Sequence, residues 1–227
     1  MWREIEFHEA ALAVRREIGD RRGEAVDLSN LGLVYSILEQ FERAIEFDMA
    51  ALAIAREAGY RDLEGGIQSN LGSTYRSLGQ VERAIQFHEA ALDIHREIGL
   101  RAGECIHLNN LGMDYRKQGQ VERAVEFYEA ALAIAREIDD RRTEGSALGN
   151  IGLAYADLGQ VERAIEFYEA ALAIAREIGD RFMEGNQLYN HGLVLEGLER
   201  REEALASLEA ALAAYESIRV PLSLIHI

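Results

Sequence analysis

An asparagine recurs every 40 residues along this chain of 227 residues. Asparagine is a mediocre helix former, so helix propensity does not explain why it returns five times in the same local sequence. Its amide both donates and accepts hydrogen bonds, which is the pairing needed to hold a peptide backbone whatever the peptide's sequence. The alternative is a structural hydrogen bond to a neighbouring helix, which would set the spacing between repeats. The five positions are Asn30, Asn70, Asn110, Asn150 and Asn190.

Other side chains near these asparagines vary from one recurrence to the next, as expected of positions that select a partner's side chains. Arg76, Arg116 and Lys117 gather positive charge in a chain whose formal net charge is -16. They would attract an acidic segment or a terminal carboxylate. The alternative is that they are the solvated ends of helices. The remaining candidate binding residues are Ser73, Asn109, Met113, Leu153 and Tyr189.

The six histidines do not form a metal-binding signature. His88 and His95 are seven residues apart, whereas two metal ligands on one helix usually come three or four residues apart. His88 stands where later repeats have Tyr128 and Tyr168, which indicates interchangeable packing, and we interpret His191 as a hydrogen-bonded packing residue. The chain shows no nucleophile with its base and no phosphate-binding loop. We therefore predict a protein that is not an enzyme and has no cofactor and no metal site.

Composition narrows the function further. The strong negative charge argues against a general binder of nucleic acid, because the phosphate backbone would be repelled. The single cysteine, Cys105, cannot form an internal disulfide, and we predict that it is buried and unreactive. Arginine or glutamate interrupts every apolar run, so no stretch reaches the roughly 18 apolar residues of a membrane span. These features predict a cytoplasmic protein that binds neither nucleic acid nor membrane.

A 40-residue repeat must position these residues. Val121–Asp139 and Val161–Gly179 differ at only two positions, and a fixed period in this range indicates a stacked repeat. Short turns such as Gly79-Gln80 predict antiparallel helix pairs. The predicted fold is all-α. We expect first helices of each pair near residues 22–38, 62–78, 102–118, 142–158 and 182–198, and second helices near 1–18, 41–58, 81–98, 121–138, 161–178 and 201–218.

Recurring small and charged residues predict how the helices pack. A glycine inside a helix costs about 1 kcal/mol relative to alanine, so its return in every repeat predicts close helix approach. Gly19 and Asp20 predict a left-handed helix end followed by a side-chain cap on the next helix. A glutamate recurs in the first turn of each first helix, where we interpret it as complementing the helix dipole. The glycines are Gly32, Gly72, Gly112, Gly152 and Gly192, and the glutamates are Glu24, Glu64, Glu104, Glu144 and Glu184.

The repeat resembles the tetratricopeptide repeat, on the signature positions Leu111, Gly112, Tyr115, Ala124, Tyr128 and Ala131. Its long, 40-residue form is similar to the repeats of Leu-Gly-Asn-type adaptors, kinesin light chains and bacterial peptide-sensing regulators. One departure is that arginine replaces the usual proline of the second helix, as at Arg56. The resemblance implies a right-handed α-solenoid of about five and a half repeats. It also implies that the first helices line a concave, peptide-binding groove in which the asparagines grip the ligand.

The resemblance therefore implies a protein–protein interaction scaffold that binds a peptide segment of a partner. The alternative is the sensor or regulatory arm of a larger signalling protein, such as a transcription regulator or a kinase, present here as a fragment.

Residues 1–218 are predicted to form a single array, with repeats in frame at residues 1, 41, 81, 121, 161 and 201. Residues 219–227 lack repeat character, and Leu222–Ile227 matches the translation of a transposase-adapter sequence, so we interpret this tail as an artefact of truncation. The array begins in mid-repeat and lacks a polar capping helix, which predicts exposed apolar faces and end-to-end self-association.

Overall fold

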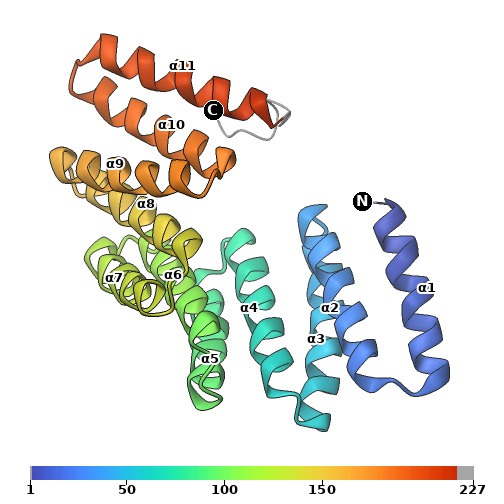
Figure 1. The fold of residues 1–227 in the computed structure, drawn as a ribbon. Coiled ribbons are helices and arrows are strands. Elements are labelled where there is room, and N and C mark those ends of the chain that lie inside the picture. Colours follow the sequence, from blue (N-terminus) through green and yellow to red (C-terminus); the bar gives the residue numbers. More distant parts are fainter. Residues whose placement is uncertain (1, 219–227) are drawn as a thin grey trace. The chain divides into compact units, whose positions relative to one another are not determined.

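A computed structural model describes residues 2–218, and within this range the chain is helical, with short turns and no strand (Figure 1). The prediction of an all-α fold built from helix pairs is confirmed. Each predicted helix is present, with ends that differ from the expected ones by a residue or two. The helices are α1 (Trp2–Ile18), α2 (Arg21–Ile37), α3 (Phe41–Ala58), α4 (Arg61–Ser77), α5 (Val81–Glu97), α6 (Arg101–Lys117), α7 (Val121–Glu137), α8 (Arg141–Asp157), α9 (Val161–Glu177), α10 (Arg181–Gly197) and α11 (Arg201–Ser217).

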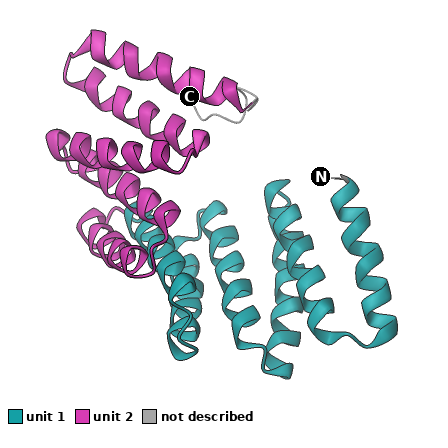
Figure 2. Cartoon of the chain, in the orientation of Figure 1, with its two compact units in different colours: residues 1–118 teal, residues 119–227 magenta. Residues whose placement is uncertain are grey.

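The helices belong to two compact units, residues 1–118 and residues 119–227 (Figure 2). In the first unit, α1 to α6 pack consecutively, and α4 also contacts both α2 and α6. In the second unit, α7 to α11 pack consecutively, and α8 contacts α10. Each unit is thus a stack in which first helices lie beside first helices. The single array over residues 1–218 stays a prediction, and the predicted tail, residues 219–227, lies outside the described residues.

The helix ends follow the capping signals in the sequence. Gly19 adopts the left-handed conformation, with φ of +74°, which glycine reaches without steric cost. Asp20 then caps α2, because its side chain accepts a hydrogen bond from the Gly23 amide at 2.9 Å. Asp140 and Asp180 cap α8 and α10 in the same way. The predicted Gly-Asp arrangement is confirmed.

The mid-helix glycines allow close packing within helix pairs, as predicted. A Cβ atom added to Gly72 would lie 2.6 Å from Nε2 of His88, on the second helix of the same pair. At Gly152 the nearest atoms would belong to the Tyr168 ring, at 2.9 Å. Both distances are too short for a side chain, so the cost of glycine is offset by seating a large residue of the facing helix.

An aromatic stack closes each of three pairs. Tyr75 lies on Phe87 with ring centroids 5.2 Å apart, and Tyr155 lies on Phe167 at 5.4 Å. Such offset stacks add about 0.5–1.5 kcal/mol beyond the area they bury. The same contact joins Tyr35 of α2 to a phenylalanine of α3. This periodic packing positions the first helices that carry the candidate binding residues.

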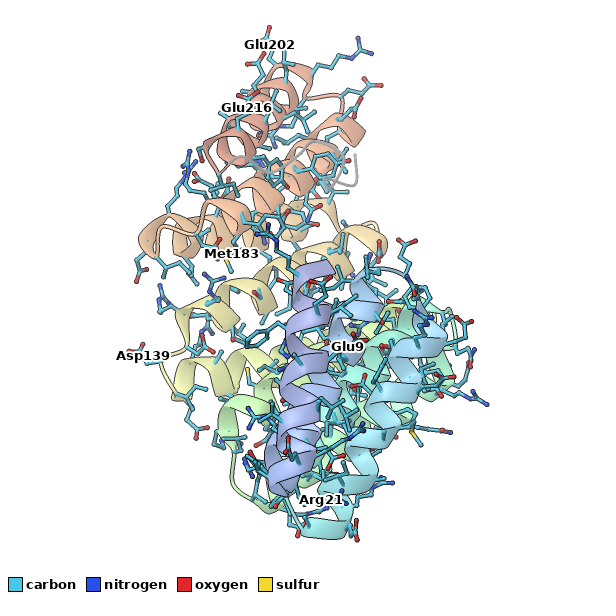
Figure 3. All side chains as sticks on the ribbon, turned by 90° about the vertical axis from the view of Figure 1, so that its right-hand side faces the viewer. Glu9, Arg21, Asp139, Met183, Glu202 and Glu216 are labelled. Atoms are coloured by element: carbon cyan, nitrogen blue, oxygen red, sulfur yellow. The ribbon has the colours of Figure 1, made fainter. Side chains whose placement is uncertain are left out.

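Charged side chains pair where a second helix ends and the next first helix begins; Figure 3 labels Arg21 at one such joint and Asp139 at another. At the α3–α4 joint, Arg56 Nε donates to one carboxylate oxygen of Glu64 at 2.9 Å, and Arg61 donates to the other. The Glu64 side chain is only 7% exposed. We call this arrangement the arginine–glutamate clamp.

Within the described residues, the clamp recurs wherever a second helix is followed by the first helix of the next pair in the same unit. The first-turn glutamates lie in the first turn, as the dipole interpretation expected, and they also serve as the acceptors of the clamp. The clamp also explains the arginine that replaces the family's proline, since Arg56 and its equivalents donate to the next first helix. The other acceptors are Glu24, Glu104, Glu144 and Glu184.

Candidate functional site

In the first unit, the recurring asparagines connect successive first helices. Asn70 on α4 donates from Nδ2 to Ser29 Oγ on α2, at 3.1 Å. Asn110 on α6 donates to Ser69 Oγ on α4, at 3.3 Å. The structural hydrogen bond considered above therefore exists at Asn70 and Asn110. Each bond uses one of the amide's two N–H groups, so the amide retains capacity for a ligand.

The five asparagines are buried to the same degree. All are half-buried, on helices α2, α4, α6, α8 and α10. Among the described residues, Asn30 and Asn190 make no side-chain hydrogen bond to the protein, so their amides are unengaged. The other candidate residues are also half-buried, except for exposed Lys117: Ser73 and Arg76 lie on α4, Asn109, Met113 and Arg116 on α6, Leu153 on α8 and Tyr189 on α10.

Arg76 is neither a solvated helix end nor a free cation. Its guanidinium group donates to Asp114 Oδ1 at 3.1 Å and to Asn110 Oδ1 at 3.4 Å, and its side chain is 16% exposed. Asp114 is fully buried on α6. The charge of Arg76 is therefore paired with Asp114 inside the protein, so it is not a solvated helix end, and its predicted attraction of an acidic segment stays a prediction. Lys117 Nζ donates to the Arg76 carbonyl oxygen at 2.8 Å.

His88 completes this buried group. Its Nδ1 lies 2.5 Å from Asp114 Oδ2, and its Nε2 lies 3.2 Å from the Ser69 carbonyl oxygen. The interpretation of His88 as a packing residue equivalent to tyrosine was therefore incomplete, because two hydrogen bonds orient the ring. The sequence carried a signal for this pair, because Asp114 is charged whereas the residues at the equivalent position of other repeats, Val34, Thr74 and Ala154, are not.

In addition to the His88–Asp114 pair, two histidines contact each other between α5 and α6. His95 Nδ1 and His107 Nε2 are 2.8 Å apart, and His95 Nε2 lies 3.3 Å from the Asp62 carbonyl oxygen. Because that carbonyl can only accept, His95 donates from Nε2 and accepts from His107. Burial, with a contribution from the neighbouring His95 and His88, lowers the pKa of His107 to about 3. The rings are inaccessible, and within the described residues no group of three or more metal-binding side chains comes together.

Two further sequence-based interpretations concern single residues. His191 makes the predicted hydrogen bond, with its Nδ1 3.1 Å from Ser207 Oγ. Cys105 is buried, as predicted.

Asp48, which stands at the His88 position of the first helix pair, was not singled out from the sequence. It is fully buried against Gly32, and neither carboxylate oxygen accepts a hydrogen bond of normal geometry from the described residues. Burial raises the pKa of Asp48 to about 8, an effect that nearby Ser29 partly offsets.

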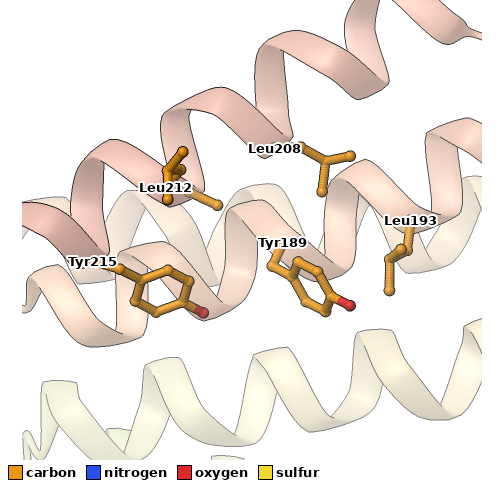
Figure 4. A pocket seen from close by; sticks show the side chains of 6 residues that line it. Tyr189, Leu193, Leu208, Leu212 and Tyr215 are labelled. Carbon is orange, nitrogen blue, oxygen red and sulfur yellow. The ribbon is translucent and has the colours of Figure 1, made fainter. Parts of the chain in front are cut away.

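An apolar pocket with a volume of about 280 Å³ opens between α10 and α11 in the second unit (Figure 4). It was not anticipated as a pocket, although Tyr189 was among the candidate binding residues. We call it the α10–α11 pocket. Its lining residues are Tyr189, Leu193, Leu208, Ala211, Leu212 and Tyr215.

Comparisons with known proteins agree with this architecture. The family described as the tetratricopeptide repeat matches residues 5–57, 64–137 and 143–217. A search of curated proteins found no match. Within residues 2–218, the helices are too short or too polar to cross a membrane.

Several solved structures share the fold. BtubC (BKLC) from P. vanneervenii is 25% identical, with a TM-score of 0.81 over 96% of this chain and 92% of its own. A putative kinesin light chain from Podosopora anserina, with nearly identical repeats, is 22% identical, with a TM-score of 0.67 over 85% and 94%. A Rap conjugation gene regulator of plasmid pLS20, solved in complex with the Phr* peptide, is 16% identical, with a TM-score of 0.75. That alignment covers 88% of this chain and 55% of the regulator.

Proposed function

Because this chain belongs to the tetratricopeptide repeat family, we propose that it is a cytoplasmic interaction scaffold, without catalytic activity, that binds a peptide segment of a partner along its first helices. The observation that supports this proposal is the register of the asparagines. An amide recurs, half-buried, at the same position of α2, α4, α6, α8 and α10. The pLS20 regulator, which was solved with a peptide, shares the fold.

The amides of Asn30, Asn70 and Asn190 suit backbone recognition because each keeps free donors and acceptors. Asn30 and Asn190 can offer every donor and acceptor, whereas Asn70 has given one N–H to Ser29. Two hydrogen bonds from one amide to an extended or helical backbone need one free N–H and one free oxygen. The structural and ligand roles are thus compatible in one side chain.

Fewer residues can give the groove a preference for acidic peptides than the sequence suggested. An acidic peptide would have to compete with buried Asp114 for Arg76, and the buried carboxylate has the advantage of a preformed contact. Any preference for acidic segments therefore falls to Arg116 and Lys117 on α6. Such a preference would weaken as salt concentration rises, because exposed charges are screened.

The test begins with peptides selected from a random linear display library on the intact chain. We expect Asn190→Ala or Asn30→Ala to weaken binding of the selected peptide by about tenfold, the loss of one or two hydrogen bonds. Helix content should not fall, because these amides make no internal hydrogen bond and alanine favours helices. Binding would be followed by fluorescence anisotropy, and folding by circular dichroism.

Ser69→Ala is the matched control, because it removes the internal partner of Asn110 and leaves the amide in place. Peptide binding that survives both asparagine substitutions, in folded protein, would refute the groove assignment. An equal loss in Ser69→Ala and Asn110→Ala would show that the amide acts only as a link between helices. If the chain is instead the sensor arm of a larger signalling protein, the same groove and the same variants apply.

A further inference from the structure

The α10–α11 pocket lies on a face that another helix covers elsewhere in the second unit. On the preceding pair, α10 packs against both α8 and α9. The approach is close: a Cβ atom added to Gly149 of α8 would lie 2.5 Å from the Gln187 side chain of α10. A helix is therefore the shape that fits this kind of face.

The α10–α11 pair departs from the repeat in size. Tyr189 stands where α8 has Gly149, and Tyr215 stands where α9 has Ala175. The Tyr215 ring lies against Gly185, and its hydroxyl donates to Asn186 Oδ1 at 2.6 Å, so the ring is held in place. A helix on this face cannot approach as closely as α10 approaches α8. The space that remains suits large apolar side chains, which would contact Leu193, Leu208 and Leu212 (Figure 4).

The charge at this face is also reversed. In α9, Arg176 donates to Glu184 of the covering helix α10 at 2.9 Å, forming the arginine–glutamate clamp. The equivalent residue of α11 is Glu216, which is exposed and labelled in Figure 3. A covering helix of the repeat type would bring a glutamate against this carboxylate, and like charges in contact repel. A helix with arginine or lysine at that place would form an ion pair.

We propose that the α10–α11 pocket docks an amphipathic helix of a partner protein, with large apolar residues on one face and a basic residue opposite Glu216. Apolar contacts with Leu208, Leu212 and Tyr215 would supply affinity, and the basic residue would set orientation and discriminate against acidic helices. The pocket shares Tyr189 with the candidate residues of the asparagine groove, but its other lining residues lie outside that set, so it adds a second binding surface to the function proposed above.

The test compares three fluorescent helical peptides by anisotropy on the intact chain. The first carries leucine at positions i, i+3, i+4 and i+7 with flanking arginines. The second has glutamate in place of each arginine. The third has the sequence of α10, Arg181–Gly197. We expect the basic peptide to bind at least about tenfold more tightly than the other two, with the difference shrinking as salt rises.

Two variants locate the site, Glu216→Arg and Leu212→Asp, and the second has a matched control. Glu216→Arg should reverse the preference between the basic and acidic peptides without altering the apolar contacts. Leu212→Asp should abolish binding, whereas Leu205→Asp, on an exposed leucine of α11 outside the pocket, should not. Asn30→Ala should leave binding of the basic peptide unchanged, which separates this site from the asparagine groove.

Three outcomes would overturn the proposal. Tighter binding of the α10 peptide than of the basic peptide would show that the face belongs to a helix of the repeat type. Concentration-dependent self-association that Leu212→Asp removes, seen by sedimentation, would show that a second copy of the chain occupies it. Equal binding of all three peptides, or no binding, would show that neither the pocket nor Glu216 selects a helix.

Discussion

Asp48 offers a sharp test of the packing described here, because its carboxyl group is fully buried without a hydrogen bond of normal geometry among the described residues. Burial raises its pKa from 3.8 to about 8. Folding at pH 7 must therefore protonate a group that is ionised in the unfolded chain. Over about three pH units, at 1.36 kcal/mol each, the upper bound of this cost is about 4 kcal/mol. The stability that a protonated Asp48 allows is complete below about pH 4 and declines as the pH rises to 8.

Asp48→Asn removes the titration and keeps the shape. The free energy of unfolding of this variant, minus that of the parent, should increase by up to about 1.4 kcal/mol per pH unit between pH 4 and pH 8, and level off above. Urea denaturation at several pH values, followed by circular dichroism, measures this difference. Asp93→Asn, on an exposed aspartate of α5, is the control and should show no such trend. A difference that stays constant from pH 4 to pH 8 would refute the reasoning.

Three further predictions concern the packing of the repeats. Glu144→Gln should lower stability by about 1–3 kcal/mol in thermal unfolding, because the clamp loses its charge while its exposed arginines return to water; an unchanged melting temperature would contradict this. Gly72→Ala should destabilise despite alanine's higher helix propensity, because the new Cβ would lie 2.6 Å from the His88 ring, and a stabilised variant would contradict the packing. Because the pKa of His107 is lowered to about 3, His107 should destabilise the folded chain increasingly as the pH drops from about 6.5, an effect opposite in sign to that of Asp48; the free energy of unfolding of His107→Gln, which can still donate to His95, minus that of the parent should therefore rise as the pH falls in urea denaturation.

The repeat pattern predicted most of the fold. Helix boundaries, the Gly-Asp caps and the close approach at the mid-helix glycines were readable because each depends on local sequence and returns every 40 residues. A local sequence pattern that recurs in five successive repeats rarely arises by chance, so it can be recognised. The candidate binding residues were located on the right helices for the same reason, although their binding role remains a prediction.

Contacts between repeats were harder to predict, because they join residues about 8 to 40 positions apart whose partnership no local rule reveals. Glu64 was interpreted from its own helix as a dipole complement, whereas two arginines, one of them on the preceding helix, determine its role. Arg76 was predicted to attract an acidic segment, or else to be a solvated helix end, and its ion pair with Asp114 on the next first helix was not foreseen.

What the sequence by itself determined is the repeat: its period and the recurrence of its asparagines can be read directly, and its helix pairs follow from backbone propensity and apolar spacing. Only the tertiary structure decided which polar groups face one another. A buried charge is tolerated only when a partner lies within hydrogen-bonding distance. The packing of neighbouring helices places His88 beside Asp114, whereas no such partner of normal geometry lies beside Asp48 among the described residues. The α10–α11 pocket likewise exists because two helices hold Tyr189 and Leu212 around one space, and this juxtaposition is a property of the packed helices.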